Sequence, residues 1–238
     1  MKSILVLSGL AFLFLQSCMI DIFNESIYGE GPVETKERNI GDFTGIKVSA
    51  GIDVFLTQGD NTQVEVVADE NLHKVIKTEI RGNVLHVYSD INIRRANSKK
   101  VYVTCKEIEE LGVSSAGDLT GQNKIVTDFL DISLSSAGDL EIEVDAKRIE
   151  CSISSSGDAR LSGSAEELYA RLSSAGNLKA FELITKKCKV RVSSAGNAKI
   201  HVTEELDASA SSAGNVYYMG DPKIKNISSS SSGGVYKR

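Results

Sequence analysis

The chain has 238 residues, of which 41% are hydrophobic and 6% aromatic, with two prolines and no tryptophan. Its 32 acidic and 27 basic residues give a net charge of −5, so nothing in the charge indicates nucleic-acid binding. The length allows a substantial buried core, while the low aromatic content excludes an ordinary bulky globular interior. Abundant serine, glycine and β-branched residues favour short strands and tight turns.

The first 17 residues predict a signal peptide. Lys2 is followed by an apolar run over residues 4–15, which is too short to span a bilayer. The run ends in Leu15-Gln16-Ser17-Cys18, which resembles the lipobox of bacterial lipoproteins, although Gln16 departs from the small residue usual there. The resemblance implies that Cys18 is acylated and becomes the first residue of a lipid-anchored protein. The alternative is ordinary secretion with a chance cysteine.

Residues 18–38 show little periodicity and contain Gly29, Gly31 and Pro32, so they predict a flexible tether between membrane and domain. Met19 and Ile20 follow the cysteine where an aspartate would favour the inner membrane. By resemblance to enterobacterial lipoproteins, this pair implies an outer-membrane location, facing either the periplasm or the cell surface.

From residue 39 the pattern becomes strand-like, with expected strands at 63–67, 78–80, 84–88 and 100–104. Arg81-Gly82-Asn83 predicts a tight hairpin, and Asp69 is expected to cap a helical turn over 71–76. Residues 39–105 form an atypical N-terminal part, expected to cover one end of the repeats that follow.

Residues 106–235 contain a six-residue motif that recurs every 18–21 residues. The copies are SSAGDL at 114–119, SSAGDL at 135–140, SSSGDA at 154–159, SSAGNL at 173–178, SSAGNA at 193–198, SSAGNV at 211–216 and the degraded SSSGGV at 230–235. Self-similarity of this period predicts an all-β, parallel β-helix-like solenoid with coils of about 19–20 residues.

Positions counted from the motif glycine separate inside from outside. Offsets −6, −4 and +2 are mostly apolar and alternate with polar residues, which predicts two strands per coil joined by a corner. The glycine is expected to hold a positive φ. The serine at offset −2 is expected to face inward in a narrow corner, so that Ser136→Leu or Ser174→Leu would unfold the domain. Cys151 and Cys188 fall on inward positions and are expected to be free, buried thiols.

The opening of the domain resembles a known family. The segments carrying the resemblance are 42–48 (DFTGIKV), 51–59 (GIDVFLTQG), 64–66 (VEV) and 68–72 (ADENL), followed by the SSAG-type repeats. They are similar to the head GIN domain, a family labelled as an autotransporter adhesin and common among lipoproteins of Bacteroidetes. The resemblance covers about 39–235 and implies a single β-helix-like domain, 39–238.

Asp118, Asp139 and Asp158 directly follow the glycine in three successive copies and are expected to form a column. Carboxylates about 4.8 Å apart are weak candidates for a Ca²⁺ site, as on β-helical polysaccharide lyases. Turn chemistry is the favoured explanation, because asparagine replaces aspartate in later copies. We therefore predict no metal and no cofactor.

No catalytic motif accompanies the repeats. His73, His86 and His201 lie in separate segments, away from any nucleophile elbow, and no phosphate loop, HExxH or dinucleotide fingerprint is present. The sequence therefore predicts a non-enzymatic binding or adhesion module of the cell envelope, with a glycan or a protein at the cell surface as partner. The alternatives are a carbohydrate-active lyase or hydrolase on the same scaffold, and a structural envelope protein that self-associates through its C-terminal coil.

Overall fold

The computed structural model describes residues 25–238, so the predicted signal peptide and Cys18 lie outside the described residues. Residues 18–38 are not wholly a tether. Strand β1 (Ser26–Tyr28) pairs with β8 (Asn92–Arg95), and β2 (Val33–Glu37) pairs antiparallel with β5 (Gln63–Asp69). The packed domain therefore begins before residue 39. Within residues 25–238, no helix is long and apolar enough to cross a bilayer.

The described chain is almost entirely β-strand, with a single short 3-10 helix, η3 (Glu70–Lys74), after β5. The other strands are β3 (Gly45–Val48), β4 (Asp53–Gln58), β6 (Ile76–Arg81), β7 (Val84–Ser89), β9 (Lys99–Cys105), β10 (Glu110–Val113), β11 (Asp118–Gly121), β12 (Ile125–Leu134), β13 (Asp139–Ile153), β14 (Asp158–Leu172), β15 (Asn177–Val192), β16 (Asn197–Ala210), β17 (Asn215–Met219), β18 (Ile224–Ser229) and β19 (Gly234–Lys237).

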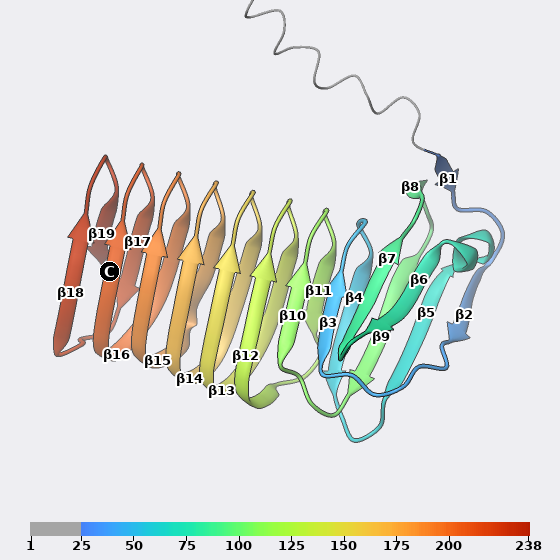
Figure 1. The fold of residues 1–238 in the computed structure, drawn as a ribbon, viewed down its shortest axis with the longest axis horizontal. Coiled ribbons are helices and arrows are strands. Elements are labelled where there is room, and N and C mark those ends of the chain that lie inside the picture. The colour runs from blue at the N-terminus through green and yellow to red at the C-terminus, as the bar shows by residue number, and fades with distance from the viewer. Residues whose placement is uncertain (1–24) are drawn as a thin grey trace, which may run out of the picture.

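These strands wind into a parallel β-solenoid of about seven turns, which confirms the fold predicted from the repeats. Each long strand from β13 to β16 begins in one layer and ends in the other, as Figure 1 shows. It bends where two consecutive outward residues, such as Lys147 and Arg148, interrupt the alternation of buried and outward positions. Coils pair in register, with Leu140 beside Ala159 and Ile153 beside Leu172.

The core is the narrow space between the two layers. Leu140, Ile142 and Val144 face it from one layer, and Ile149 and Ile153 face it from the other, each at most 3% exposed. Apolar residues stacked on their equivalents remove a continuous surface from water, at roughly 25 cal/mol per Å². Burial at offsets −6, −4 and +2 is confirmed for the copies up to residue 216, but in the last copy Ile227 and Ser229 are exposed and Val235 is only partly buried.

The corner at the motif differs from the prediction. In the turn 135–138, Ser136 and Ala137 have φ of 49° and 59°, while Gly138 is not among the residues with positive φ. The Gly138 N–H donates to the Ser135 carbonyl at 3.0 Å, which closes a tight turn whose two central residues are left-handed. The serine at offset −2 is exposed and does not face inward, and the glycine is buried.

The glycine is required for space. A Cβ added to Gly138 would lie 2.5 Å from the carbonyl oxygen of Val113 in the preceding coil. The coil β3–β4 has a shifted motif: Ala50 and Gly51 are its left-handed residues, and buried Ile52 takes the place of the glycine, so the requirement for glycine applies to the repeat coils and not to this one. Asp53 is consequently in register with Asp118.

The atypical N-terminal part covers one end of the stack, as predicted. Strands β7 and β9 form the outermost coil, parallel to β3 and β4, although they follow those strands in sequence. Antiparallel strands then close this end: β6 pairs with β7, β5 with β9, and β2 with β5. Antiparallel additions end the parallel stack and cover its edges, which would otherwise pair with another chain.

Two local predictions in this part have different outcomes. The hairpin at Gly82 is present, with φ of 63°, between β6 and β7. Asp69 makes no side-chain cap on η3. Its buried carboxylate instead accepts hydrogen bonds from the backbone N–H groups of Asn97 (2.9 Å) and Ser98 (3.3 Å), which fixes the β8–β9 loop.

Candidate ligand groove

The predicted aspartate column is present and is one residue longer than the motif indicated. Asp53, Asp118, Asp139 and Asp158 are in register on successive coils and continue into Asn177, Asn197 and Asn215. The asparagine part forms a ladder in which the Asn197 amide donates to the Asn177 side-chain oxygen at 3.4 Å. Among the described residues, no three His, Cys, Asp or Glu side chains are arranged to hold a metal ion.

The neighbouring carboxylates of this column each make ionisation of the next one less favourable. Burial, and then the charges of Asp53 and Asp139, raise the pKa of Asp118. Burial and Asp158 raise the pKa of Asp139, while Lys179, 2.8 Å from Asp158, opposes this shift. The column therefore carries repulsion that is only partly compensated, at the point where the chain leaves each turn.

A hollow of about 960 Å³ lies on the outer face of the layer that leads into the turns. Two columns of outward residues run along it, at offsets −3 and −5 from the motif glycine, on either side of the buried offset −4. The first column is Ser49, Ser114, Ser135, Ser154, Ser173, Ser193 and Ser211. The second column, in register across eight strands from β7 to β16, is His86, Lys47, Gly112, Ser133, Ser152, Arg171, Arg191 and Ser209.

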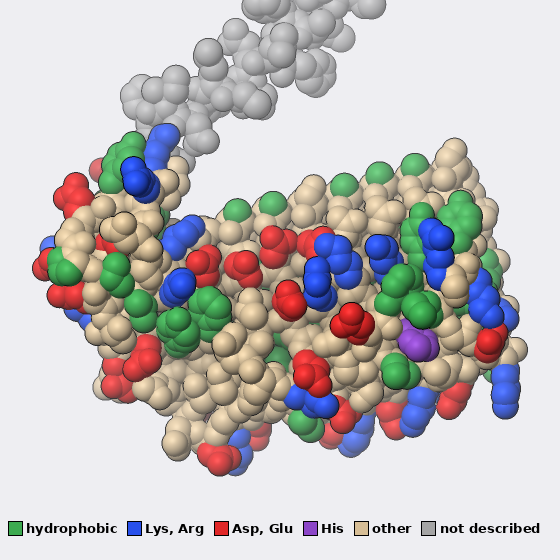
Figure 2. Space-filling view, turned by 180° about the vertical axis from the view of Figure 1, so that it is seen from behind, with side chains coloured by type: hydrophobic (Ala, Val, Ile, Leu, Met, Phe, Trp, Pro, Cys, Tyr) green, Lys and Arg blue, Asp and Glu red, His purple; other side chains and the backbone are tan. Residues whose placement is uncertain are grey.

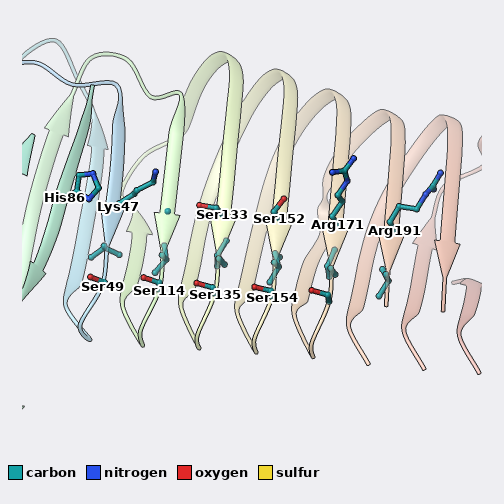
Figure 3. Close-up of a pocket in the computed structure, with 18 of the residues that line it drawn as sticks. Lys47, Ser49, His86, Ser114, Ser133, Ser135, Ser152, Ser154, Arg171 and Arg191 are labelled. Atoms are coloured by element: carbon teal, nitrogen blue, oxygen red, sulfur yellow. The ribbon is translucent and has the colours of Figure 1, made fainter. Parts of the chain in front are cut away.

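Size and charge change along the second column, as Figure 3 shows. His86 and Lys47 lie at one end and Arg171 and Arg191 lie at the other, with small residues between them. Adjacent strands are about 4.8 Å apart, so Lys47 and Arg171 are separated by roughly 19 Å along the solenoid axis. We call this trough, from Lys47 to Arg171 with the adjoining serine column, the serine groove.

The two arginines differ in what they contact. Arg191 donates to Asp207 through both terminal nitrogens, at 3.0 and 2.9 Å, and this fixes its side chain. Arg171 is exposed, and within residues 25–238 its guanidinium makes no ion pair. Arg171 is therefore a cation whose donors are free to meet a ligand.

The other end of the serine groove is less positive than its residue types suggest. Lys47 forms an ion pair with Glu110 at 2.5 Å, and its side chain lies over Gly112, where a Cβ would come within 2.8 Å of Lys47 Cγ. Burial, and then Arg81 and Lys47, lower the pKa of His86. His86 is thus a neutral imidazole at pH 7 that offers one donor and one acceptor.

Hydrogen bonding is the chemistry that this surface offers. Each serine hydroxyl supplies a donor and two acceptor lone pairs, repeated at the strand spacing. Within residues 25–238, no serine hydroxyl is hydrogen-bonded to a histidine side chain. The groove suits an extended polar chain with an anionic group near Arg171.

Sequence reasoning did not identify the serine groove. The charged residues at offset +3, Glu141, Arg160 and Lys179, lie on the outer face of the other layer and form a solvated ladder. The usable signal was at offset −5, where Gly112, Ser133 and Ser152 change to Arg171 and Arg191 in successive repeats. Figure 2, seen from behind, shows acidic and basic side chains interspersed on that face.

The fold and the groove define a class of protein: a capped, parallel β-solenoid with a long polar groove along one layer. The model of the family described as "Putative auto-transporter adhesin, head GIN domain" matches residues 42–222. The chain belongs to this family, which confirms the resemblance.

Several solved structures share the fold. One described as a putative adhesin from Bacteroides fragilis aligns with a TM-score of 0.79 at 22% identity, covering 89% of this chain and 100% of that one. A putative lipid binding protein from Parabacteroides distasonis gives 0.74 at 24% identity, covering 90% and 100%. A putative adhesin from Parabacteroides merdae gives 0.71 at 25% identity, covering 90% and 99%. No curated protein matches the sequence.

Proposed function

We propose that this protein is a non-enzymatic binding module of the cell envelope that holds an extended glycan along the serine groove. The single observation that carries this proposal is the register of small polar residues over successive coils, ending at the exposed cation Arg171. The family description and the names of two of the similar structures, each described as a putative adhesin, support a binding or adhesion role at the cell surface.

A glycan suits the groove because its hydroxyl groups match repeated serine hydroxyls, and because the groove follows the axis of the solenoid. The long side next to Ser133 and Ser152 carries Glu110, Asp131 and Glu150 in register, so the middle of the groove favours an uncharged chain. An acidic sugar is favoured only at the Arg171 end. A lyase or hydrolase would need carboxylates on both sides of the bound chain, whereas these acids form a single column along one side of the groove.

A glycan array tests this function. The full chain should be retained on a subset of neutral or mono-acidic oligosaccharides, and Ser152→Trp, which fills the groove, should abolish retention. Glu141→Trp is the matched control, because Glu141 is also outward on β13 but lies in the other layer. Failure to bind any glycan, or equal retention of the two variants, would count against the proposal.

We further propose that acylation of Cys18 anchors the module in the outer membrane, with the residues before β1 as the connection. The support is the lipobox-like sequence and the apolar run before it. Metabolic labelling with a fatty acid should mark the wild-type chain in the outer-membrane fraction and leave Cys18→Ala unlabelled. Labelling of both chains, or of neither, would contradict lipidation at this residue.

A further inference from the structure

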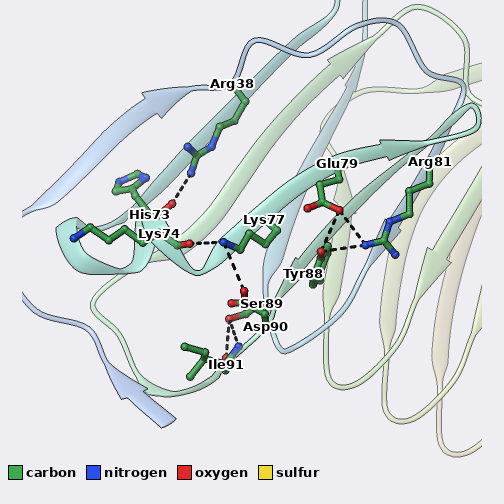
Figure 4. Close-up of polar contacts among 10 residues, drawn as sticks. All are labelled: Arg38, His73, Lys74, Lys77, Glu79, Arg81, Tyr88, Ser89, Asp90 and Ile91. Carbon is green, nitrogen blue, oxygen red and sulfur yellow. Dashed lines mark hydrogen bonds and ion pairs between the residues drawn. The ribbon is translucent and has the colours of Figure 1, made fainter. Parts of the chain in front are cut away.

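A second hollow, of about 350 Å³, lies at the capped end of the solenoid, away from the serine groove. Figure 4 shows the elements that build it: the segment after β2 contributes Arg38, η3 contributes His73 and Lys74, and β6 contributes Lys77 and Glu79. Four of these five side chains are basic. Neither the family description nor the names of the similar structures refer to this part of the fold.

Two polar atoms in this cluster have no partner. Among the described residues, Arg38 Nε and His73 Nδ1 are the buried side-chain nitrogens or oxygens without a hydrogen bond. His73 is 8% exposed, so its side chain is more than nine-tenths buried. Leaving a buried polar group unpaired costs about 1–3 kcal/mol, and such groups in folded proteins usually have a partner.

The existing contacts determine what these two atoms offer. His73 Nε2 lies 3.1 Å from the Glu34 carbonyl oxygen and must donate to it, which leaves Nδ1 without a hydrogen bond among the described residues. One terminal nitrogen of Arg38 donates to the His73 carbonyl at 3.1 Å, which holds the guanidinium beside the imidazole. Arg38 Nε is then a fixed, unused donor.

The surrounding charges favour an anion. The single acid lining the hollow, Glu79, is neutralised by Arg81 at 3.0 Å and accepts from the Tyr88 hydroxyl at 3.1 Å. Lys77 donates to the Lys74 carbonyl at 2.7 Å and lies 3.6 Å from Asp90. The Lys74 ammonium makes no ion pair within residues 25–238.

We propose that this hollow is a binding site for a tetrahedral oxyanion, a phosphate or sulfate group, held by Arg38, His73 and Lys74. The oxygens of the anion accept from Arg38 Nε and from the protonated His73 Nδ1, while Lys74 supplies charge at the mouth. Charge-assisted bonds of this kind are about twice as strong as neutral ones. The group is either a soluble ion or the headgroup of an anionic lipid.

Binding at this site takes up a proton. In the free protein, burial and then the charges of Lys36 and Arg38 hold the pKa of His73 below its ordinary value, so the imidazole is neutral. An anion offsets these charges and favours the imidazolium, with Lys74, Lys77, Glu34 and Glu79 as the other charged groups nearby. Affinity for sulfate, which does not titrate in this range, should therefore rise as the pH falls from about 7.5 to 5.5.

Isothermal titration of the full chain with sodium sulfate tests the proposal. We expect one saturable site, with affinity reduced about tenfold or more in Arg38→Gln because a hydrogen bond to a charged group is lost. Lys74→Gln, an exposed change that leaves the buried contacts intact, should also weaken binding. Lys147→Gln, which removes an exposed cation on β13 outside both hollows, is the control and should bind sulfate as wild type does.

Two further measurements identify whether the bound anion is a soluble ion or a lipid headgroup, and check that each variant is folded. Thermal unfolding of each variant reports whether the domain remains intact. Competition between sulfate and phosphatidylglycerol vesicles, but not phosphatidylcholine vesicles, would assign the group to a lipid headgroup, and absence of competition would assign it to a soluble oxyanion. The proposal is overturned if sulfate does not saturate, or if Arg38→Gln and Lys74→Gln both bind it as wild type does.

Discussion

Two left-handed residues that are not glycine form the turn in every copy of the repeat motif, and backbone hydrogen bonds between successive turns compensate for their conformation. The left-handed region costs an L-residue roughly 1–2 kcal/mol. In return, the Ala137 N–H donates to the Ser155 carbonyl of the next coil at 3.0 Å, and the same bond recurs from Ala116 to Ala213. Serine and alanine occupy these positions because the turn is exposed and small, and the buried glycine behind it admits the neighbouring coil.

Two substitutions in the turn 135–138 test whether glycine is needed at the buried position or at the left-handed one. Gly138→Ala places a Cβ against the Val113 backbone and should reduce the free energy of unfolding by about 1–3 kcal/mol, as overpacking does. Ala137→Gly, one residue earlier, relieves a left-handed residue at the expense of chain entropy and should change it by less than about 1 kcal/mol. Urea denaturation measures both changes. A larger loss for Ala137→Gly would show that the assignment is wrong.

The exposed serine at offset −2 gives a second prediction. Ser136→Leu should leave the free energy of unfolding within about 1 kcal/mol of wild type, because the side chain points to solvent and surface changes are usually small. This outcome is opposite to the one expected from the repeat pattern alone. A thermal unfolding scan that showed loss of the folded state would restore the inward position.

The aspartate column gives a pH-dependent prediction. Because the folded-state pKa values of Asp118 and Asp139 are raised, their favourable contribution is complete below about pH 3.9 and is lost as the pH rises. Asp118→Asn should therefore stabilise the protein at pH 7, by about 0.2–1 kcal/mol for removed like-charge contacts, and should have little effect at pH 3. If Asp118→Asn instead lowered the free energy of unfolding at pH 7, and if Ca²⁺ stabilised the wild type, the column would be a metal site.

At the scale of strands and coils, the period-2 alternation made the interior predictable, because a strand that faces a narrow core must bury every second residue. Leu134, Ile153 and Leu172 are inward as the offsets required. The turn was not predictable, because glycine is the residue that most readily adopts positive φ and the motif places it beside the two residues that actually do so. The serine groove depends on register across eight strands, which one repeat does not contain.

The order of coils at the capped end was equally inaccessible to sequence reasoning. Strand β3 lies between β7 and β10, so coil 45–58 has neighbours that come later in the chain on both sides. Nothing in the alternation of β3 specifies those partners. Non-local pairing of this kind is decided by how the cap packs, and the sequence predicted only that a cap exists.

Burial of thiols within the coils gives a prediction about reactivity. Burial raises the pKa of Cys105 and, with a smaller effect of Asp131, that of Cys151 to about 12, and it raises the pKa of Cys188 as well. Iodoacetamide at pH 8 should therefore leave all three unmodified in the folded protein and modify them after denaturation. The same shifts imply that stability falls as the pH rises above about 9, where the unfolded thiols ionise. Rapid alkylation of the folded protein would contradict the burial.

For the whole molecule, the two ends of the stack differ. The N-terminal end is closed by antiparallel strands, whereas β18 pairs only with β16 among the described strands and exposes Ile224 and Ile227 at 55% and 46%. An open edge with apolar side chains favours pairing with a second copy. Light scattering should detect concentration-dependent dimers that Ile227→Lys abolishes. A wild-type chain that remains monomeric at high concentration would refute self-association at this end.

The serine groove is proposed to bind an extended glycan whose acidic group meets Arg171. The most direct test of this proposal is calorimetric affinity for the tightest ligand from the glycan array, compared between wild type, Arg171→Gln and Lys147→Gln. Lys147 is an exposed cation at the bend of β13, outside the groove. Arg171→Gln should weaken binding about tenfold or more, as loss of a charge-assisted hydrogen bond does, and Lys147→Gln should leave it unchanged. Equal affinity of all three proteins would contradict the claim.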